Sequence, residues 1–211
     1  PPRQASLEIT IDTHIDSLSK GSAVIVLRNS LAAAARYAFR ELTLERWKQY
    51  MQEVISANLF QIRLSDFRFV SEDEHSMTVR ASAEASKFAV TSEPRTYIPQ
   101  TPFITQFTSV LEREHDSLPL RFDSETRLKL LLNIRAPKRT LDAPRPLSFG
   151  RKDGPWTFTA SASQSGELIS FLYDYSSVKK DIQQRDKTEF FPFIKQYLSN
   201  KKNRFIILQQ P

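Results

Sequence analysis

Two stretches decide the fold class, Ala5-Ser-Leu-Glu-Ile-Thr-Ile-Asp-Thr-His-Ile-Asp16 and Val24-Ile-Val-Leu27. In the first stretch apolar and polar residues alternate, so that Leu7, Ile9 and Ile11 fall on one face. A period of two is typical of a strand that buries one face. A short polar turn separates the two stretches, and we therefore expect an antiparallel β-hairpin at the start of the chain.

Alternation of the same kind recurs along the chain and predicts further strands. The two runs that flank the acidic turn 71–74 give the clearest hairpin pattern, and a second hairpin is expected around Gly166. The proline-bearing segments 92–102 and 137–146 are expected to interrupt regular structure, and 103–111 has a weak strand pattern. The predicted strands cover residues 59–69, 77–85, 128–135, 156–163, 167–176 and 205–208.

Three segments carry helical periodicity. Residues 31–40 are rich in alanine, a strong helix former. Apolar residues recur at spacings of three and four over 44–57 and again over 188–198, which predicts one apolar stripe on each helix. Thr43 and Thr188 are the predicted N-caps. We also expect Trp47 and Trp156 to be buried, because each lies on an apolar face of its element.

These elements predict a mainly β fold with a few helices, of the α+β class. We expect antiparallel, β-sandwich-like sheets with two or three packed helices. The chain divides into residues 1–90, with hairpin, helices and hairpin, and residues 91–211, which are β-rich and end in a helix and a strand. The two portions are compatible with two domains or with one continuous domain.

Composition excludes several kinds of site. The 211 residues contain no cysteine, which excludes a disulfide framework, a thiolate zinc site and a cysteine nucleophile. Only four glycines are present, which argues against a glycine-rich phosphate-binding loop. No run of 18 apolar residues predicts a transmembrane helix. Because the sequence starts with prolines rather than with methionine or a signal peptide, we interpret it as a piece of a longer protein.

Residues of the kinds that carry chemistry are few and scattered. His14, His75 and His115 lack metal-ligand spacing, and each is expected to be a hydrogen-bonded surface group. The acidic run 72–74 lacks the pattern of a calcium loop, and there is no Gly-x-Ser-x-Gly elbow. We therefore predict no catalytic, cofactor-binding or metal-binding residue and no cofactor. A small carboxylate-based hydrolase stays open, because the separation of paired carboxylates depends on the fold.

The formal net charge of +6 is unevenly distributed. Residues 127–152 contain eight Lys or Arg and one Asp, and residues 179–204 contain eight Lys or Arg and three acids. Such regions could contact nucleic acid or an anionic surface. We interpret them instead as solvated faces of packed elements, because basic residues such as Lys129 alternate with apolar ones. No specific nucleic-acid binding is expected.

Several of these patterns, in this order, resemble the C-terminal non-catalytic region of a family of bacterial transglutaminase-like proteins. Members of that family carry an N-terminal β-rich domain of unknown function before a papain-like core, and a β-rich tail follows the core. The resemblance covers about residues 5–208, and the sequence departs from the family in being poor in glycine. It rests on the stretches Leu7–Ile11, Ala23–Leu27, Ala35–Arg40, Leu118–Leu120, Ile134–Pro137 and Phe190–Leu198.

The resemblance implies an accessory domain rather than an enzyme. It implies docking against the neighbouring catalytic domain of the parent chain, or binding of a protein or glycan partner. The family's catalytic cysteine has no counterpart here, so no catalytic residue is carried over. The resemblance also implies a periplasmic, cell-envelope or otherwise exported location.

Overall fold

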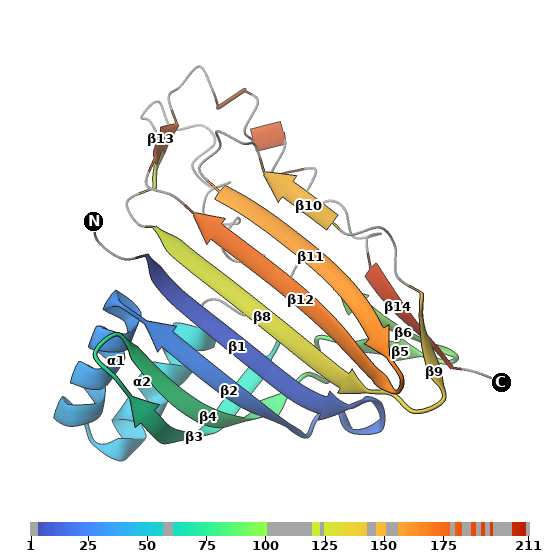
Figure 1. Cartoon of the computed structure of the whole chain (residues 1–211), viewed down its shortest axis with the longest axis horizontal. Helices are drawn as coiled ribbons and strands as arrows, with labels where there is room; N and C mark the ends of the chain where they lie inside the picture. The colour runs from blue at the N-terminus through green and yellow to red at the C-terminus, as the bar shows by residue number, and fades with distance from the viewer. Residues whose placement is uncertain are drawn as a thin grey trace.

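The computed structural model of the protein describes residues 4–56, 61–100, 120–122, 125–142, 147–150, 156–177, 180–182, 187–188, 191–192, 195 and 204–209. They form a large sheet, a four-stranded sheet, a two-stranded ribbon and two helices with defined bounds (Figure 1). The expected mainly β, α+β fold is confirmed. The eight strands of the large sheet lie in the order β10 (Leu147–Gly150), β11 (Trp156–Ser165), β12 (Leu168–Ser177), β8 (Thr126–Arg135), β1 (Ala5–His14), β2 (Gly21–Arg28), β4 (Ser76–Glu84) and β3 (Arg63–Glu72).

The predicted first hairpin is confirmed. Strands β1 and β2 pair antiparallel with Ile9 opposite Ile25, and a short 3₁₀ turn, η1 (Ile15–Ser17), follows β1. The apolar residues of the alternation are the buried ones, with Ile11 and Ile25 fully inaccessible to solvent. Period two therefore identified the buried face of these strands correctly.

The β1–β8 pair is the exception to an antiparallel sheet. Residues 5–14 run parallel to residues 126–135, with Ile9 beside Leu130, whereas the other pairings in the described sheets are antiparallel. A hairpin forces antiparallel pairing, but β1 and β8 are far apart in the chain and are free to align in either direction. The pairing also brings four strands from residues 1–90 and four from 91–211 into one sheet.

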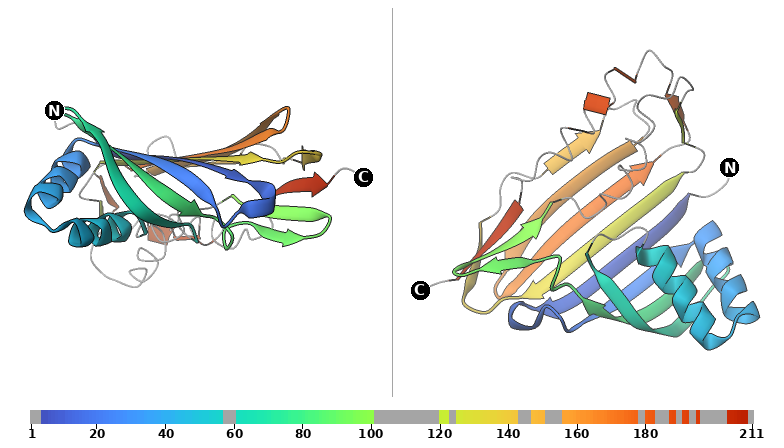
Figure 2. Two further views of the ribbon diagram at one scale, coloured as in Figure 1. Left: turned by 90° about the horizontal axis from the view of Figure 1, so that it is seen from below. Right: turned by 180° about the vertical axis from the view of Figure 1, so that it is seen from behind.

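Both predicted helices near the N-terminus are confirmed, as α1 (Ser30–Glu41) and α2 (Leu44–Ser56). The Thr43 hydroxyl accepts a hydrogen bond from the Arg46 backbone N–H at 3.4 Å, as an N-cap does. Trp47 is fully buried, as expected. The helices cover the back of the sheet near β2, β4 and β3 (Figure 2).

The predicted hairpin around the acidic turn is confirmed as β3 and β4. Register shifts between Ser65 and Arg68 and between Phe69 and Ser71 interrupt the pairing on the β3 side. Strand β3 is one edge of the large sheet, and β10 is the other. The second predicted hairpin is β11–β12, which turns at Gly166 with φ +59°, a conformation that suits glycine.

A second layer packs on the same face of the large sheet as the helices, but towards the β10 edge rather than the β3 edge (Figure 2). It is formed by β5 (Val90–Ser92), β6 (Arg95–Pro99), β14 (Arg204–Gln209) and β9 (Arg139–Asp142), in that order. The rings of Phe205 and Phe171 meet across the layers with centroids 5.2 Å apart, and the Tyr173 hydroxyl donates to the Pro99 carbonyl at 2.7 Å. The expected final strand is thus confirmed as β14.

The predicted interruptions of regular structure are wrong in part at both proline-bearing segments. Strand β6 lies within 92–102, β9 lies within 137–146, and both pair with β14. The prolines that flank β9 in the sequence concealed a strand of only four residues.

Of the predicted helix 188–198 the structure describes residues 188, 191, 192 and 195, all helical, and Lys187 is already helical before the predicted cap. The segment 103–111 and the side chain of Trp156 lie outside the described residues. A short ribbon of β7 (Leu120–Phe122) and β13 (Lys180–Ile182) completes the described elements.

Candidate functional site

The two described histidines are surface groups with local partners. His14 precedes η1, and its Nδ1 accepts from the Asp16 backbone N–H at 3.4 Å. The Nε2 of His75 lies 3.8 Å from a Glu74 carboxylate oxygen. His115 lies outside the described residues. Within the part of the chain that the structure describes, no group of three or more His, Asp or Glu is arranged to hold a metal ion.

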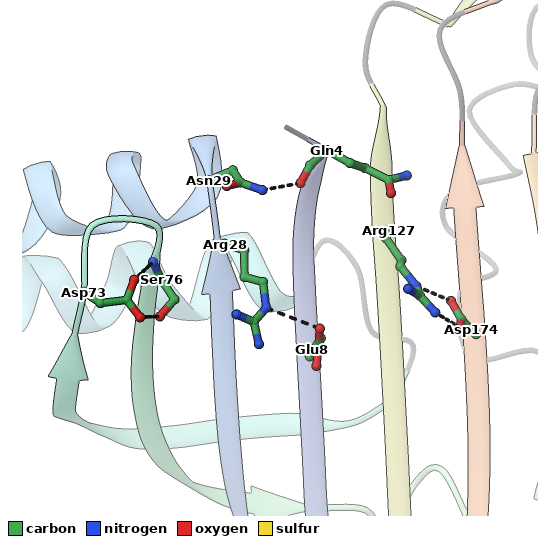
Figure 3. Close-up of polar contacts among 8 residues, drawn as sticks. All are labelled: Gln4, Glu8, Arg28, Asn29, Asp73, Ser76, Arg127 and Asp174. Atoms are coloured by element: carbon green, nitrogen blue, oxygen red, sulfur yellow. Dashed lines mark hydrogen bonds and ion pairs between the residues drawn. The ribbon is translucent and has the colours of Figure 1, made fainter. Parts of the chain in front are cut away.

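The acidic turn between β3 and β4 fastens the hairpin to α1. The Asp73 carboxylate accepts hydrogen bonds from the Ser76 hydroxyl at 2.6 Å and from the Ser76 backbone N–H at 2.7 Å (Figure 3). The His75 backbone N–H also donates to this carboxylate, at 2.7 Å. These bonds hold the pKa of Asp73 below its ordinary value, because they stabilise the ionised carboxylate. The Arg36 guanidinium donates to the backbone carbonyls of Asp73 and Glu74, so this acidic cluster is engaged within the fold.

In its described residues, the open face of the large sheet carries two cross-strand ion pairs over β2, β1, β8 and β12. Arg127 of β8 donates twice to the Asp174 carboxylate, at 3.0 and 2.5 Å, and Arg28 Nε lies 3.5 Å from Glu8 (Figure 3). The hydrogen bonds to Asp174 raise the pKa of Arg127. Lys129 stands in register between Glu8 and Asp174. Acids of β1 and β12 therefore offset much of the positive charge that β8 contributes to the basic region 127–152.

The second basic region, 179–204, is described only in part. Its described basic side chains are those of Lys187, Lys195 and Arg204. Lys187 is buried, and the Arg204 guanidinium lies over the Tyr97 ring, 6.0 Å from its centroid. The other basic residues of 179–204 lie outside the residues whose side chains the structure describes.

A small pocket lies beside the start of β3 and the end of β4. Its cavity volume is ≈ 170 Å³, and Glu84 is the one carboxylate in its lining. The Ser86 hydroxyl donates to that carboxylate at 2.8 Å. A carboxylate-based hydrolase needs two converging acids, and this pocket supplies one. The lining residues are Gln61, Ile62, Arg63, Glu84, Ser86 and Lys87.

Exposed apolar side chains gather at the β3 edge of the sheet. Eight large apolar side chains are exposed among the described residues, and six of them lie on α1, on β3, in the α1–α2 connection or at the start of α2. The Phe39 ring stacks on the Phe69 ring with centroids 5.2 Å apart, and it meets the edge of buried Trp47 at 5.0 Å. Both phenylalanines remain more than one-third exposed. We call this group the edge cluster: Phe39, Leu42, Leu44, Phe69 and Val70.

Two arginines lie on the other face of the same edge. Arg68 of β3 is directly opposite Arg80 of β4, and both are exposed. The neighbours of Arg80 along β4, Val79 and Ala81, point into the core, so the two arginines share the open face of the sheet. Among the described residues, neither arginine has an ion pair with a carboxylate. We call Arg68 and Arg80 the arginine pair.

Sequence patterns did not identify the edge cluster as a surface. Phe39 lies in an alanine-rich helix and Phe69 in an alternating strand, and both patterns are typical of core residues. Phe69 does point to the covered side of the sheet, opposite buried Val79. It stays exposed because β3 is the last strand, and no sequence signal marks an edge position.

The comparisons with known proteins add no relative to this picture. No protein-family model matches the chain, and no curated protein or solved structure matches it. Of the helices in the described part of the chain, none has the length and apolar character needed to cross a membrane. Function therefore has to be inferred from the geometry above.

Proposed function

We propose that this chain is a non-catalytic accessory and interaction domain of a larger bacterial transglutaminase-like protein. It docks on the papain-like core of that protein or binds a separate partner. The observation that carries the proposal is the edge cluster, where stacked aromatic rings are left partly exposed at one corner of the fold. Contiguous exposed apolar patches are typical of interaction surfaces.

A protein partner fits the edge cluster better than a glycan. Aromatic side chains that bind sugars offer a free ring face to the ligand. Here Phe39 and Phe69 stack on each other with an interplanar angle of 19°, which occupies one face of each ring. Leu42 in the α1–α2 connection and Leu44 at the start of α2 add aliphatic surface that suits apolar side chains of a protein.

The two alternative functions have weaker support. The pocket beside β3 and β4 holds one carboxylate, which does not favour a carboxylate-based hydrolase. The bidentate contact of Arg127 with Asp174 withdraws that guanidinium from phosphate binding. We expect only weak, non-specific binding to DNA. A gel-shift titration near physiological salt that gave a dissociation constant on the order of 10⁻⁸ M or tighter would favour a nucleic-acid-binding module instead.

The sequence that precedes Pro1 in the gene tests the proposed parent protein. The proposal predicts a papain-like core with a cysteine nucleophile there, together with export to the periplasm or cell envelope. The isolated chain is predicted to incorporate no amine into glutamine, because it has no thiol to attack the amide. A coding region that encodes another kind of domain, or turnover above that of a heat-inactivated control, would contradict the proposal.

A further inference from the structure

The β3 edge has two chemically different sides. Phe39 and Phe69 of the edge cluster lie on the side that faces the helices, where their rings stack. The arginine pair lies on the open side, with no carboxylate in ion-pair contact among the described residues. Elsewhere on the same face, Arg28 and Arg127 each have an acid from a neighbouring strand. Arg135 of β8 also lies on this face without an ion pair among the described residues, so the β3 edge is distinguished by two such arginines standing directly opposite each other.

Charge determines which partner complements this edge. Like charges directly opposite each other on neighbouring strands are destabilising, and a carboxylate between Arg68 and Arg80 would relieve that repulsion. A second copy of this chain, placed by two-fold symmetry at the edge, would bring another arginine pair instead. The arrangement thus favours a different chain that carries acidic residues.

The backbone of β3 limits how such a partner is held. Two register shifts and the positive φ of Asp66, 53°, leave no more than three consecutive β3 residues in regular pairing, Arg63–Ser65. Bulges of this kind twist an edge strand and oppose the addition of a further strand. A partner at this edge therefore depends on contacts with side chains rather than on a long backbone ladder.

We propose that the edge cluster and the arginine pair together bind a short protein segment in which apolar side chains stand next to carboxylates. The apolar residues of the segment cover Phe39 and Phe69, and its carboxylates bind Arg68 and Arg80. This inference rests on the proposed interaction function and names the chemistry of the partner. The segment belongs to a separate protein, in keeping with the different, acidic chain that the arginine pair favours.

A random peptide library displayed on phage tests the inference directly. The purified chain is the bait, and the enriched peptides are synthesised and titrated against wild type and variants. We expect peptides that combine apolar and acidic residues. Phe69→Ser is expected to weaken their binding about tenfold or more, as for a residue at the centre of an interface. Arg68→Gln with Arg80→Gln is expected to weaken it about fivefold, in keeping with exposed ion pairs, and to reduce its dependence on salt.

Matched variants control for loss of folding. Leu168→Ser removes an equally exposed apolar side chain at the far end of β12, and Arg135→Gln removes an exposed strand arginine of β8. Neither is expected to change binding, and every variant is checked for an unchanged circular dichroism spectrum and unfolding midpoint.

Each other outcome would overturn the inference in a recognisable way. If Phe69→Ser weakens peptide binding but the arginine variants leave it unchanged, the edge cluster is an interaction surface. The proposed acidic chemistry of the partner is then refuted. A wild-type dimer in sedimentation that Phe69→Ser dissociates would replace the partner segment with a second copy of the chain. Failure to enrich any peptide from the library would count against both the inference and the proposed interaction function.

Discussion

At the scale of single residues, Asp73 shows how a polar side chain closes a turn. Its carboxylate receives three hydrogen bonds from residues 75 and 76, and Arg36 binds the carbonyls of the same turn. The turn thereby connects the β3–β4 hairpin to α1, which carries Phe39. A residue with no part in binding thus helps to position the edge cluster.

Asp73 is predicted to make stability depend on acidity. Because its folded-state pKa is lowered, its contribution is present above the unfolded-state pKa and is lost as pH falls through the folded-state value. Asp73→Asn should therefore lower the unfolding midpoint at about pH 6, and the difference from wild type should shrink towards about pH 2. Thermal unfolding followed by circular dichroism at both pH values measures this. A difference of the same size at both pH values would show that ionisation of the Asp73 carboxylate does not contribute to stability. The control is Glu41→Gln, which removes an exposed carboxylate at the end of α1.

Residues whose structural role depends on their sequence neighbours could be predicted from the sequence. The Thr43 cap and the burial of Trp47 follow from neighbours within one or two helical turns, and both are confirmed. The exposure of Phe69 and the unpaired state of Arg68 follow instead from the position of β3 at the end of the strand order in the described sheet. That information is held in the order of the strands, which alternation along one strand does not encode.

At the scale of elements, α1 packs through alanine. Ala32 and Ala35 are fully buried, and the helix contacts β1, β2 and β4. Small side chains let the helix lie close to the sheet. The alanine run predicted the helix correctly, although its propensity alone did not reveal which alanines face the sheet.

Enlarging one buried alanine should be costly. Ala35→Leu is predicted to reduce the free energy of unfolding by about 1–3 kcal/mol, because extra methylene groups do not fit a close-packed interface. Ala34→Leu, on the exposed side of the same helix, should change stability by no more than about 0.5 kcal/mol. Urea unfolding of both variants provides the comparison. Equal losses for the two would contradict the packing described for α1.

At the scale of the whole molecule, the parallel β1–β8 pair connects the two portions of the chain. Hairpins were predictable because a turn fixes both partner and direction, as in β1–β2, β3–β4 and β11–β12. The pairing of β1 with β8 joins residues more than a hundred positions apart, and no local pattern specifies it. The sequence therefore predicted the strands and their buried faces but not the single large sheet.

The shared sheet predicts cooperative unfolding of both portions. Trp47→Phe leaves Trp156 as the fluorescent reporter of the second portion, and Trp156→Phe leaves Trp47 as the reporter of the first. In each variant the urea midpoint from fluorescence should coincide with the midpoint from far-ultraviolet circular dichroism, as two-state unfolding requires. Two separated transitions would show that residues 1–90 and 91–211 unfold as independent units.

Amide hydrogen exchange tests the central claim most directly, namely that the β3 edge is the binding surface of this domain. Exchange is measured for the whole chain with and without a saturating concentration of an enriched peptide. We predict slower exchange in residues 38–44 and 67–72, with exchange in β8 unchanged. Protection confined to β8 and β12 on the open face, or to the pocket residues 61–63 and 84–87, would contradict the account.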